Sequence, residues 1–132
     1  MIGREVQMAV GKLKSEKLAS ALRIQSVVLQ EVHRFMQKRG VLQLLPVMIS
    51  PITDPLNHSV MDGEISYYDD KLQLTKSMIL HKQLSLIGSS NAIYIISPNV
   101  RLETMDKGST GRHLLEFTQV DFEIKGSTAK QA

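Results

Sequence analysis

Two stretches of the sequence decide the fold: AIYIISPNVRLE (Ala92–Glu103) and LLEFTQVDFEI (Leu114–Ile124). Both are rich in β-branched and aromatic residues, whereas the link TMDKGSTGRH (Thr104–His113) is polar and contains two glycines. This succession is typical of two strands joined at one end of a sheet. We therefore predict an antiparallel hairpin with a long, mobile tip.

Side chains alternate across a strand, so each strand of this hairpin has an apolar and a polar face. The apolar positions are Tyr94, Ile96, Val100, Leu102, Val120, Phe122 and Ile124. If these form the core, the opposite side chains line one shared surface: Arg101, Glu103, Phe117, Gln119, Asp121 and Glu123. One interpretation is a sheet with one solvated face. The other is a ligand-binding floor, in which Arg101 clamps a phosphate, Phe117 stacks on a base and the two acids hold an ammonium group.

The first part of the chain predicts a helix, a strand and a loop. From Glu16 to Lys38 apolar residues recur at steps of three and four, which indicates a helix with Ser15 as its N-cap and Gly40 after its end. The apolar segment Val41–Ile49 predicts a strand buried on both faces. Ser50–Gly63 contains two prolines and predicts a loop, long enough to suggest a functional or mobile segment.

Between these two parts the pattern predicts a hairpin and a second helix. Glu64–Tyr68 and Lys71–Leu74 read as strands on either side of a turn at Asp69–Asp70. Thr75 then opens a helix that runs to about Leu86. The expected elements together give an α+β fold, an antiparallel sheet flanked by helices.

Composition limits the possible functions. The chain has 132 residues, enough for one core. It has no cysteine, which excludes disulfides and thiolate sites and fits a reducing cytosol, so we expect a cytoplasmic protein. The net charge of +3 argues against strong nucleic-acid binding by this piece alone, and no apolar stretch is long enough to span a membrane. The histidines are too scattered to predict a metal site: His33, His58, His81 and His113.

The hairpin sequence resembles the catalytic core of class II aminoacyl-tRNA synthetases, in the aspartyl/asparaginyl branch. The second signature motif of that branch is arginine-x-glutamate, followed after a loop by arginine-histidine-leucine-x-glutamate-phenylalanine. Arg101–Glu103 and Arg112–Phe117 match it. The long helix, Gly40 and Val41–Ile49 resemble the first motif, which forms the dimer interface in the family. Within the branch, the chain is similar to the archaeal asparagine synthetase related to asparaginyl-tRNA synthetase.

The resemblance implies an ATP site in the hairpin. Arg101 would grip the α-phosphate and is the expected catalytic residue. Glu103 would contact the adenine edge, and His113, assisted by Arg112, would contact the outer phosphates. Phe117 would stack on adenine.

The resemblance also implies an aspartate site. The stretch SMILHKQ (Ser77–Gln83) resembles a family segment ending in lysine-glutamine, whose lysine contacts the side-chain carboxylate of aspartate. Lys82 is therefore the expected specificity residue, because a carboxylate offers only acceptors where an amide also offers donors. Asp121 and Glu123 would hold the α-amino group of the substrate, and Gln119 would line the same pocket.

These matches suggest how the chain is organised. Residues 1–15 are expected to be a lead-in and residues 125–132 a polar tail. Residues 16–124 would be the N-terminal half of a class II core, with motifs 1 and 2. The third motif and the family's Mg²⁺-binding carboxylates are expected outside this chain.

Three functions remain open on the sequence. The first, which Lys82 and the expected lack of an anticodon-binding domain favour, is ATP-dependent activation of aspartate as aspartyl-adenylate with transfer to ammonia, as in an asparagine synthetase, impaired in this chain. The second is a fragment of an aspartyl- or asparaginyl-tRNA synthetase, with tRNA as acceptor. The third is a non-catalytic fragment that dimerises or binds ATP. The expected partners are ATP, aspartate, ammonia and a second copy of the chain.

Overall fold

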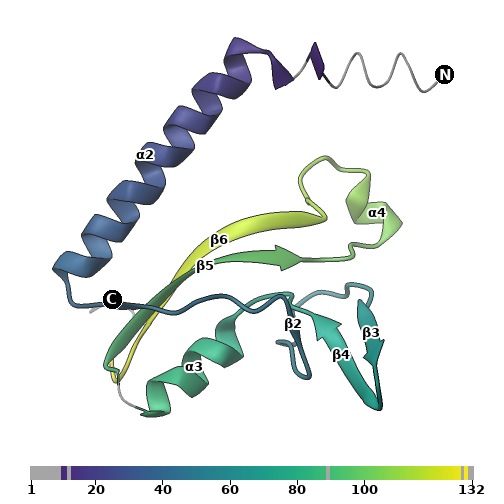
Figure 1. Ribbon diagram of the computed structural model, residues 1–132. Helices are drawn as coiled ribbons and strands as arrows, with labels where there is room; N and C mark the ends of the chain where they lie inside the picture. The colour runs from purple at the N-terminus through teal and green to yellow at the C-terminus, as the bar shows by residue number, and fades with distance from the viewer. Residues whose placement is uncertain (1–9, 12, 89, 129, 131–132) are drawn as a thin grey trace. The chain divides into compact units, whose positions relative to one another are not determined.

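The chain divides into two compact units, residues 1–39 and residues 40–132. The computed structural model describes residues 10–11, 13–88, 90–128 and 130 (Figure 1). The expected lead-in, residues 1–15, lies largely outside the described residues, as does the end of the expected tail. The boundaries at residues 16 and 124 stay predictions.

The first unit contains helix α2 (Glu16–Lys38), which has the predicted bounds. Ser15 caps it as predicted, because its side-chain oxygen accepts a hydrogen bond from the backbone N–H of Leu18 at 3.2 Å. This contact satisfies one of the N–H groups that have no partner in the first turn. Gly40 follows the helix with a φ of 69°, a backbone conformation that glycine adopts without strain. Within the described part of the chain, no helix has the length and apolarity that crossing a membrane requires.

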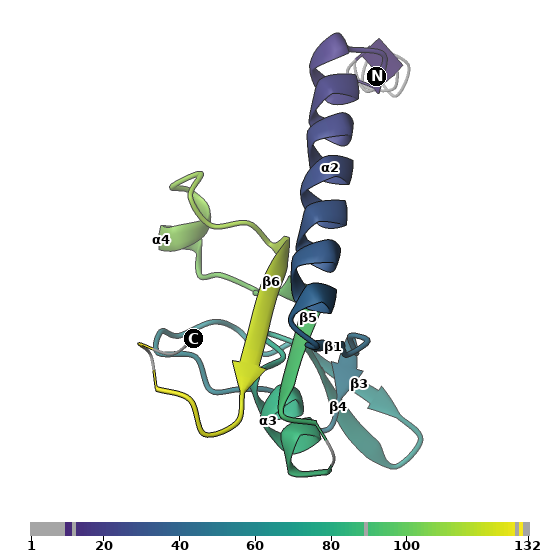
Figure 2. The same ribbon diagram turned by 90° about the vertical axis from the view of Figure 1, so that its left-hand side faces the viewer.

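The second unit contains two three-stranded sheets and two helices. The first sheet has the order β1-β5-β6, with β1 at Leu42–Gln43, β5 at Ala92–Val100 and β6 at Glu116–Ile124. The second has the order β2-β4-β3, with β2 at Ile49–Ser50, β4 at Asp70–Leu74 and β3 at Glu64–Tyr67. The helices are α3 (Ile79–Gly88) and the short α4 (Met105–Gly108), which lies in the link between β5 and β6. The predicted α+β class is confirmed, and Figure 2 shows β5 and β6 side by side.

The prediction of one strand buried on both faces over Val41–Ile49 is wrong. The segment gives β1 to one sheet and the first residue of β2 to the other, and it has no regular structure between them. Pro46 lies in this interval and lacks the N–H that a strand ladder needs. Apolar side chains along it are exposed, Leu45 by 76% and Leu42 by 59%. An apolar sequence in this segment therefore does not mean that its side chains are buried within this chain.

The predicted hairpin before α3 is confirmed. β3 and β4 are antiparallel, and Tyr67 pairs with Asp70. The turn therefore consists of Tyr68 and Asp69, with Tyr68 at a φ of 52°.

Helix α3 begins at Ile79 and not at Thr75, because the backbone of Thr75 is hydrogen-bonded to neighbouring segments. Its N–H donates to the carbonyl of Met48 at 2.9 Å, and its carbonyl accepts from the N–H of Val100 at 3.0 Å. Its hydroxyl donates to the carbonyl of Val47 at 2.9 Å, and the side chain is fully buried. Thr75 thus joins the two sheets instead of opening the helix.

The ladder between β5 and β6 brings the polar positions onto one side of the sheet. Asn99 is opposite Phe117, and Ile95 is opposite Asp121. Directly opposed residues of an antiparallel pair point to the same side, so the predicted shared face is confirmed. Both strands are shorter than predicted at the link, since β5 ends at Val100 and β6 begins at Glu116. Beyond the end of β5, Leu102 forms an isolated bridge with Met61.

The burial of the two faces differs from the prediction in part. Tyr94 of the predicted core face is 1% exposed, but the polar face is also covered and part of the apolar face is exposed. Helix α3 packs on the face that carries the polar residues, where Ile95, Ser97 and Asn99 are at most 1% exposed. On the face predicted to be the core, Val120 is 42% and Phe122 is 41% exposed. Alternation gives the two faces of a strand but not which of them a helix covers.

We expect Thr75→Val to lower the free energy of unfolding by about 1 kcal/mol, because it removes the hydrogen bond from the buried hydroxyl to the carbonyl of Val47 while conserving side-chain volume. Urea unfolding followed by circular dichroism measures the change. Thr118→Val, at an exposed position of β6, is the control and should change the free energy by less than about 0.5 kcal/mol. Equal stability of the two variants would contradict this role of Thr75.

Candidate functional site

A pocket lies where β5 and β6 meet their connecting link. Its volume is about 210 Å³, and it is lined by Arg101, Glu103, Arg112, His113, Leu114 and Phe117. All five residues predicted to bind ATP are in this set. The structure therefore brings the predicted ATP residues together, although they are up to sixteen positions apart in the sequence.

Arg101 and Phe117 form the floor of this pocket. The guanidinium carbon of Arg101 lies 4.8 Å from the centroid of the Phe117 ring, within range of a cation–π interaction. The Nε of Arg101 donates to the carbonyl of Lys76 at 3.2 Å. These two contacts orient the side chain, and a planar guanidinium so held has further N–H donors available for phosphate oxygens.

Glu103 is the acid among the residues that line the pocket. Its side chain is 6% exposed, and its Oε1 lies 3.2 Å from Nε2 of His58. Its Oε2 is buried and accepts no hydrogen bond from the described residues. A buried carboxylate oxygen without a donor is costly and therefore suited to a ligand that brings one.

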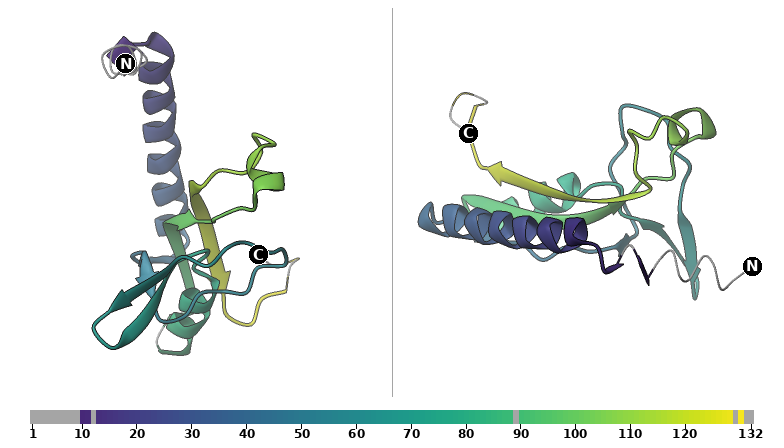
Figure 3. Two further views of the ribbon diagram at one scale, coloured as in Figure 1. Left: turned by 90° about the vertical axis from the view of Figure 1, so that its right-hand side faces the viewer. Right: turned by 90° about the horizontal axis from the view of Figure 1, so that it is seen from above.

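Arg112 and His113 belong to the link, which extends beyond the ends of the two strands (Figure 3). Nδ1 of His113 is 3.2 Å from the hydroxyl of Thr110. In the same link a hydrogen bond with the side chain of Thr104 lowers the pKa of Asp106. Both side chains predicted to contact phosphates are exposed and therefore accessible to a ligand.

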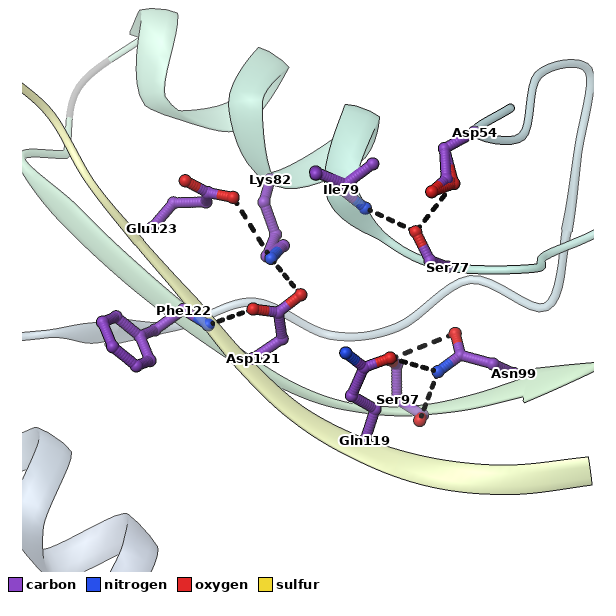
Figure 4. A network of polar contacts seen from close by, with 10 residues as sticks. All are labelled: Asp54, Ser77, Ile79, Lys82, Ser97, Asn99, Gln119, Asp121, Phe122 and Glu123. Atoms are coloured by element: carbon purple, nitrogen blue, oxygen red, sulfur yellow. Dashed lines mark hydrogen bonds and ion pairs between the residues drawn. The ribbon is translucent and has the colours of Figure 1, made fainter. Parts of the chain in front are cut away.

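The second predicted cluster surrounds Lys82. Figure 4 shows its ammonium between two acids of β6, paired with Asp121 and, at 3.3 Å, with Oε1 of Glu123. The lysine is 1% exposed, and the acids are 31% and 27% exposed. A buried charge is tolerated when it is paired and hydrogen-bonded, as here. The acids expected to hold the α-amino group of a substrate thus already hold an ammonium from α3.

Gln119 lies on the same face of β6, between Phe117 of the pocket and Asp121 of the lysine cluster. Its Oε1 accepts a hydrogen bond from Nδ2 of Asn99 at 3.3 Å (Figure 4). Asn99 is fully buried and also donates to the carbonyl of Ser97 at 3.4 Å. Because the carbonyl of Ser97 can only accept, the amide of Asn99 is fixed with its nitrogen toward Gln119.

Two contacts of the site were not predicted, that of His58 with Glu103 and that of Asn99 with Gln119. His58 is in the loop before β3, 45 positions from Glu103, and was assigned no partner. Asn99 lies on the face of the hairpin that was predicted to be polar, but its hydrogen bond with Gln119 was not predicted. The alternation of side chains does place Asn99 and Gln119 on the same face, so their contact could have been found from the sequence. No pattern in the sequence indicates the contact of His58 with Glu103.

Among the described residues, no group of three or more His, Cys, Asp or Glu side chains is arranged so that it could hold a metal ion.

The pocket and the lysine cluster lie on the antiparallel pair β5–β6, whose sheet is completed by β1 in parallel with β5. The chain matches the family of class II tRNA synthetases (D, K and N) over residues 4–132. It belongs to this family.

Curated relatives are tRNA ligases and are much longer than this chain. The cytoplasmic aspartate–tRNA ligase of Caenorhabditis elegans is 27% identical over 85% of this chain and 20% of its own length. The aspartate–tRNA(Asp/Asn) ligase of Methanococcoides burtonii is 30% identical over 84% of this chain and 24% of its own length. The chain thus spans about a fifth to a quarter of these relatives.

Solved structures show the same fold. The asparaginyl-tRNA synthetase of Pyrococcus horikoshii, complexed with asparaginyl-adenylate, aligns with a TM-score of 0.77 and 17% identity over 90% of this chain and 26% of that one. That of Entamoeba histolytica aligns with a TM-score of 0.72 and 20% identity over 94% and 26%. The predicted class II synthetase-like fold is confirmed.

We expect Lys82→Met to lower the free energy of unfolding by about 2–3 kcal/mol, because it leaves two neighbouring carboxylates without their counterion. Urea unfolding measures this loss. Adding Asp121→Asn and Glu123→Gln to the variant should restore part of it by removing the repulsion. Lys71→Met removes an exposed pair with Glu64 and should cost less than about 1 kcal/mol. A Lys82→Met variant no less stable than Lys71→Met would show that the cluster does not form.

Proposed function

We propose that the chain forms the ATP-binding and amino-acid-binding half of the active site of an aspartyl- or asparaginyl-tRNA synthetase. The observation that carries this proposal is the single pocket lined by Arg101, Glu103, Arg112, His113 and Phe117. A base would stack on the phenyl ring of Phe117, and Arg101, Arg112 and His113 would contact the phosphates. Membership in the family supports the same assignment.

The proposed reaction is formation of an acyl-adenylate. A carboxylate oxygen of the amino acid attacks the α-phosphorus of ATP, a new P–O bond forms, and the bond to the leaving pyrophosphate breaks. Arg101, on the α-phosphate, would stabilise the charge that grows on its oxygens in the transition state. Such chemistry depends on positioning and charge neutralisation and requires no protein nucleophile.

Lys82 is the proposed contact for the side chain of the amino acid. An ammonium has three donors, and two are directed at Asp121 and Glu123. The third would donate to the side-chain carboxylate of aspartate. The partly exposed acids have further oxygens that would accept hydrogen bonds from the α-amino group, and Gln119 would line the wall between the two ligands. A lysine here favours aspartate over asparagine, since it has no acceptor for the amide N–H groups.

The acceptor in the second step is proposed to be the terminal ribose of tRNA. The sequence-based preference for ammonia finds no support among the relatives described above, each of which is named as a tRNA ligase. In the proposed step a ribose hydroxyl attacks the acyl carbon and AMP leaves. One relative is described as cytoplasmic, which supports that location here.

Two further partners belong to this proposal. Mg²⁺ would accompany ATP, as it does in phosphoryl transfer generally, and its ligands are expected outside this chain. A second copy of the chain would dock through the first motif, as predicted from the resemblance. The exposed apolar side chains of the segment from β1 to β2, including Leu42 and Leu45, support such an interface.

We expect Arg101→Ala to weaken ATP binding by about 10- to 100-fold, because it removes a charge-assisted contact to the α-phosphate and the cation–π partner that orients Phe117. Isothermal titration of the whole chain with ATP gives the dissociation constants. Arg34→Ala, which removes an exposed pair with Glu31 on α2, should leave them unchanged. Equal affinity of the Arg101→Ala variant and the unsubstituted chain would contradict the assignment of the pocket.

Exchange of labelled pyrophosphate into ATP tests the reaction. We expect exchange to require an amino acid and to be at least tenfold faster with aspartate than with asparagine. A subsequent chase with tRNA or with ammonium salts identifies the acceptor, and we expect acylated tRNA. ATP binding without exchange above background would favour the non-catalytic alternative.

A further inference from the structure

We propose that His58 is a positioning residue for adenine recognition, which acts by holding the carboxylate of Glu103 in the nucleotide pocket. The proposal rests on the proposed function, because it assumes that this pocket binds ATP. It adds to that function a positioning residue and a preference for the 6-amino group of adenine. His58 comes from the loop between β2 and β3, outside both strands of the hairpin.

The first observation is the contact between the two side chains. Nε2 of His58 is 3.2 Å from Oε1 of Glu103. Glu103 is 6% and His58 35% exposed, so the acid is buried while the histidine approaches it from the solvent side. An ionised carboxylate only accepts hydrogen bonds, so Nε2 carries the proton of this contact.

The second observation is that the loop is fixed to the same part of the chain at other points. The N–H of Met61 donates to the carbonyl of Leu102 at 2.8 Å, next to Glu103 in the sequence. Nζ of Lys76 pairs with Asp62 at 2.6 Å, and the carbonyl of Lys76 accepts from Arg101. His58 is therefore held beside the pocket by contacts that do not involve its ring.

The third observation is the other oxygen of the same carboxylate. Oε2 of Glu103 is buried and accepts no hydrogen bond from the described residues, although Glu103 lines the pocket. With Oε1 held by His58, the rotation of the carboxylate is restricted and Oε2 is left as the acceptor for a ligand. The 6-amino group of adenine is a donor of the right kind, whereas a purine without it offers none there.

The experiment compares ATP with purine riboside triphosphate, which lacks the 6-amino group, by isothermal titration of the whole chain. The unsubstituted chain should bind ATP about tenfold more tightly, as expected for one hydrogen bond to a charged acceptor. In His58→Ala this preference should fall to about twofold or less, with affinity for purine riboside triphosphate unchanged. His58→Gln, whose amide donates from a similar position, should restore most of the preference. Asn57→Ala, an exposed neighbour in the same loop, should retain all of it.

The outcomes separate this proposal from the one on which it depends. If the unsubstituted chain binds ATP with the expected preference and His58→Ala retains it, the role of His58 is wrong and the ATP site stands. Equal loss of affinity for both nucleotides in His58→Ala would indicate a general effect on the fold and would also overturn it. If the unsubstituted chain binds neither nucleotide, the proposed function fails and this inference with it.

Discussion

The antiparallel ladder between β5 and β6 determines which side chains meet at the candidate site. Its register sets Asn99 opposite Phe117 and Ile95 opposite Asp121, so the polar residues of both strands face helix α3. A slip of one residue would turn the side chains of β6 to the other side of the sheet. Phe117 would then leave Arg101, and Asp121 would leave Lys82. Both parts of the site therefore depend on this one pairing.

The two parts differ in how their charges are balanced. Lys82 is buried and paired with two acids, so its charge is compensated before any ligand arrives. In the pocket, by contrast, Arg112 and His113 are exposed and Glu103 has an oxygen without a donor. This contrast fits a lysine that its two acids hold in place before a ligand binds, beside a pocket that a charged ligand completes. The pocket and the lysine cluster are close to each other, because Phe117 and Asp121 are four positions apart on one face of β6, which corresponds to roughly 13 Å along the strand.

Much of the fold could be predicted because local signals and long-range contacts agreed. The cap at Ser15, the bounds of α2 and the pairing of the last two strands follow from spacing alone. The predictions failed where tertiary contacts compete with local preference. Thr75 is a good helix N-cap by type, but its backbone and hydroxyl bond to other segments. The polar face of the hairpin was expected to be exposed to solvent. Helix α3 covers it instead, because Lys82 of the helix provides the counterion for Asp121 and Glu123. His58 and Glu103 are 45 positions apart, and no periodic pattern in the sequence predicts their contact.

Cysteine cross-linking tests the register of this ladder most directly, because the chain has no cysteine of its own. Ile96 and Val120 are directly opposite each other, on the face away from α3. Opposed side chains at such positions are close enough for a disulfide. The account predicts that Ile96→Cys with Val120→Cys becomes cross-linked on mild oxidation, while Ile96→Cys with Gln119→Cys does not. Cross-linking of the second pair in preference to the first would move β6 by one residue and contradict the site built on it.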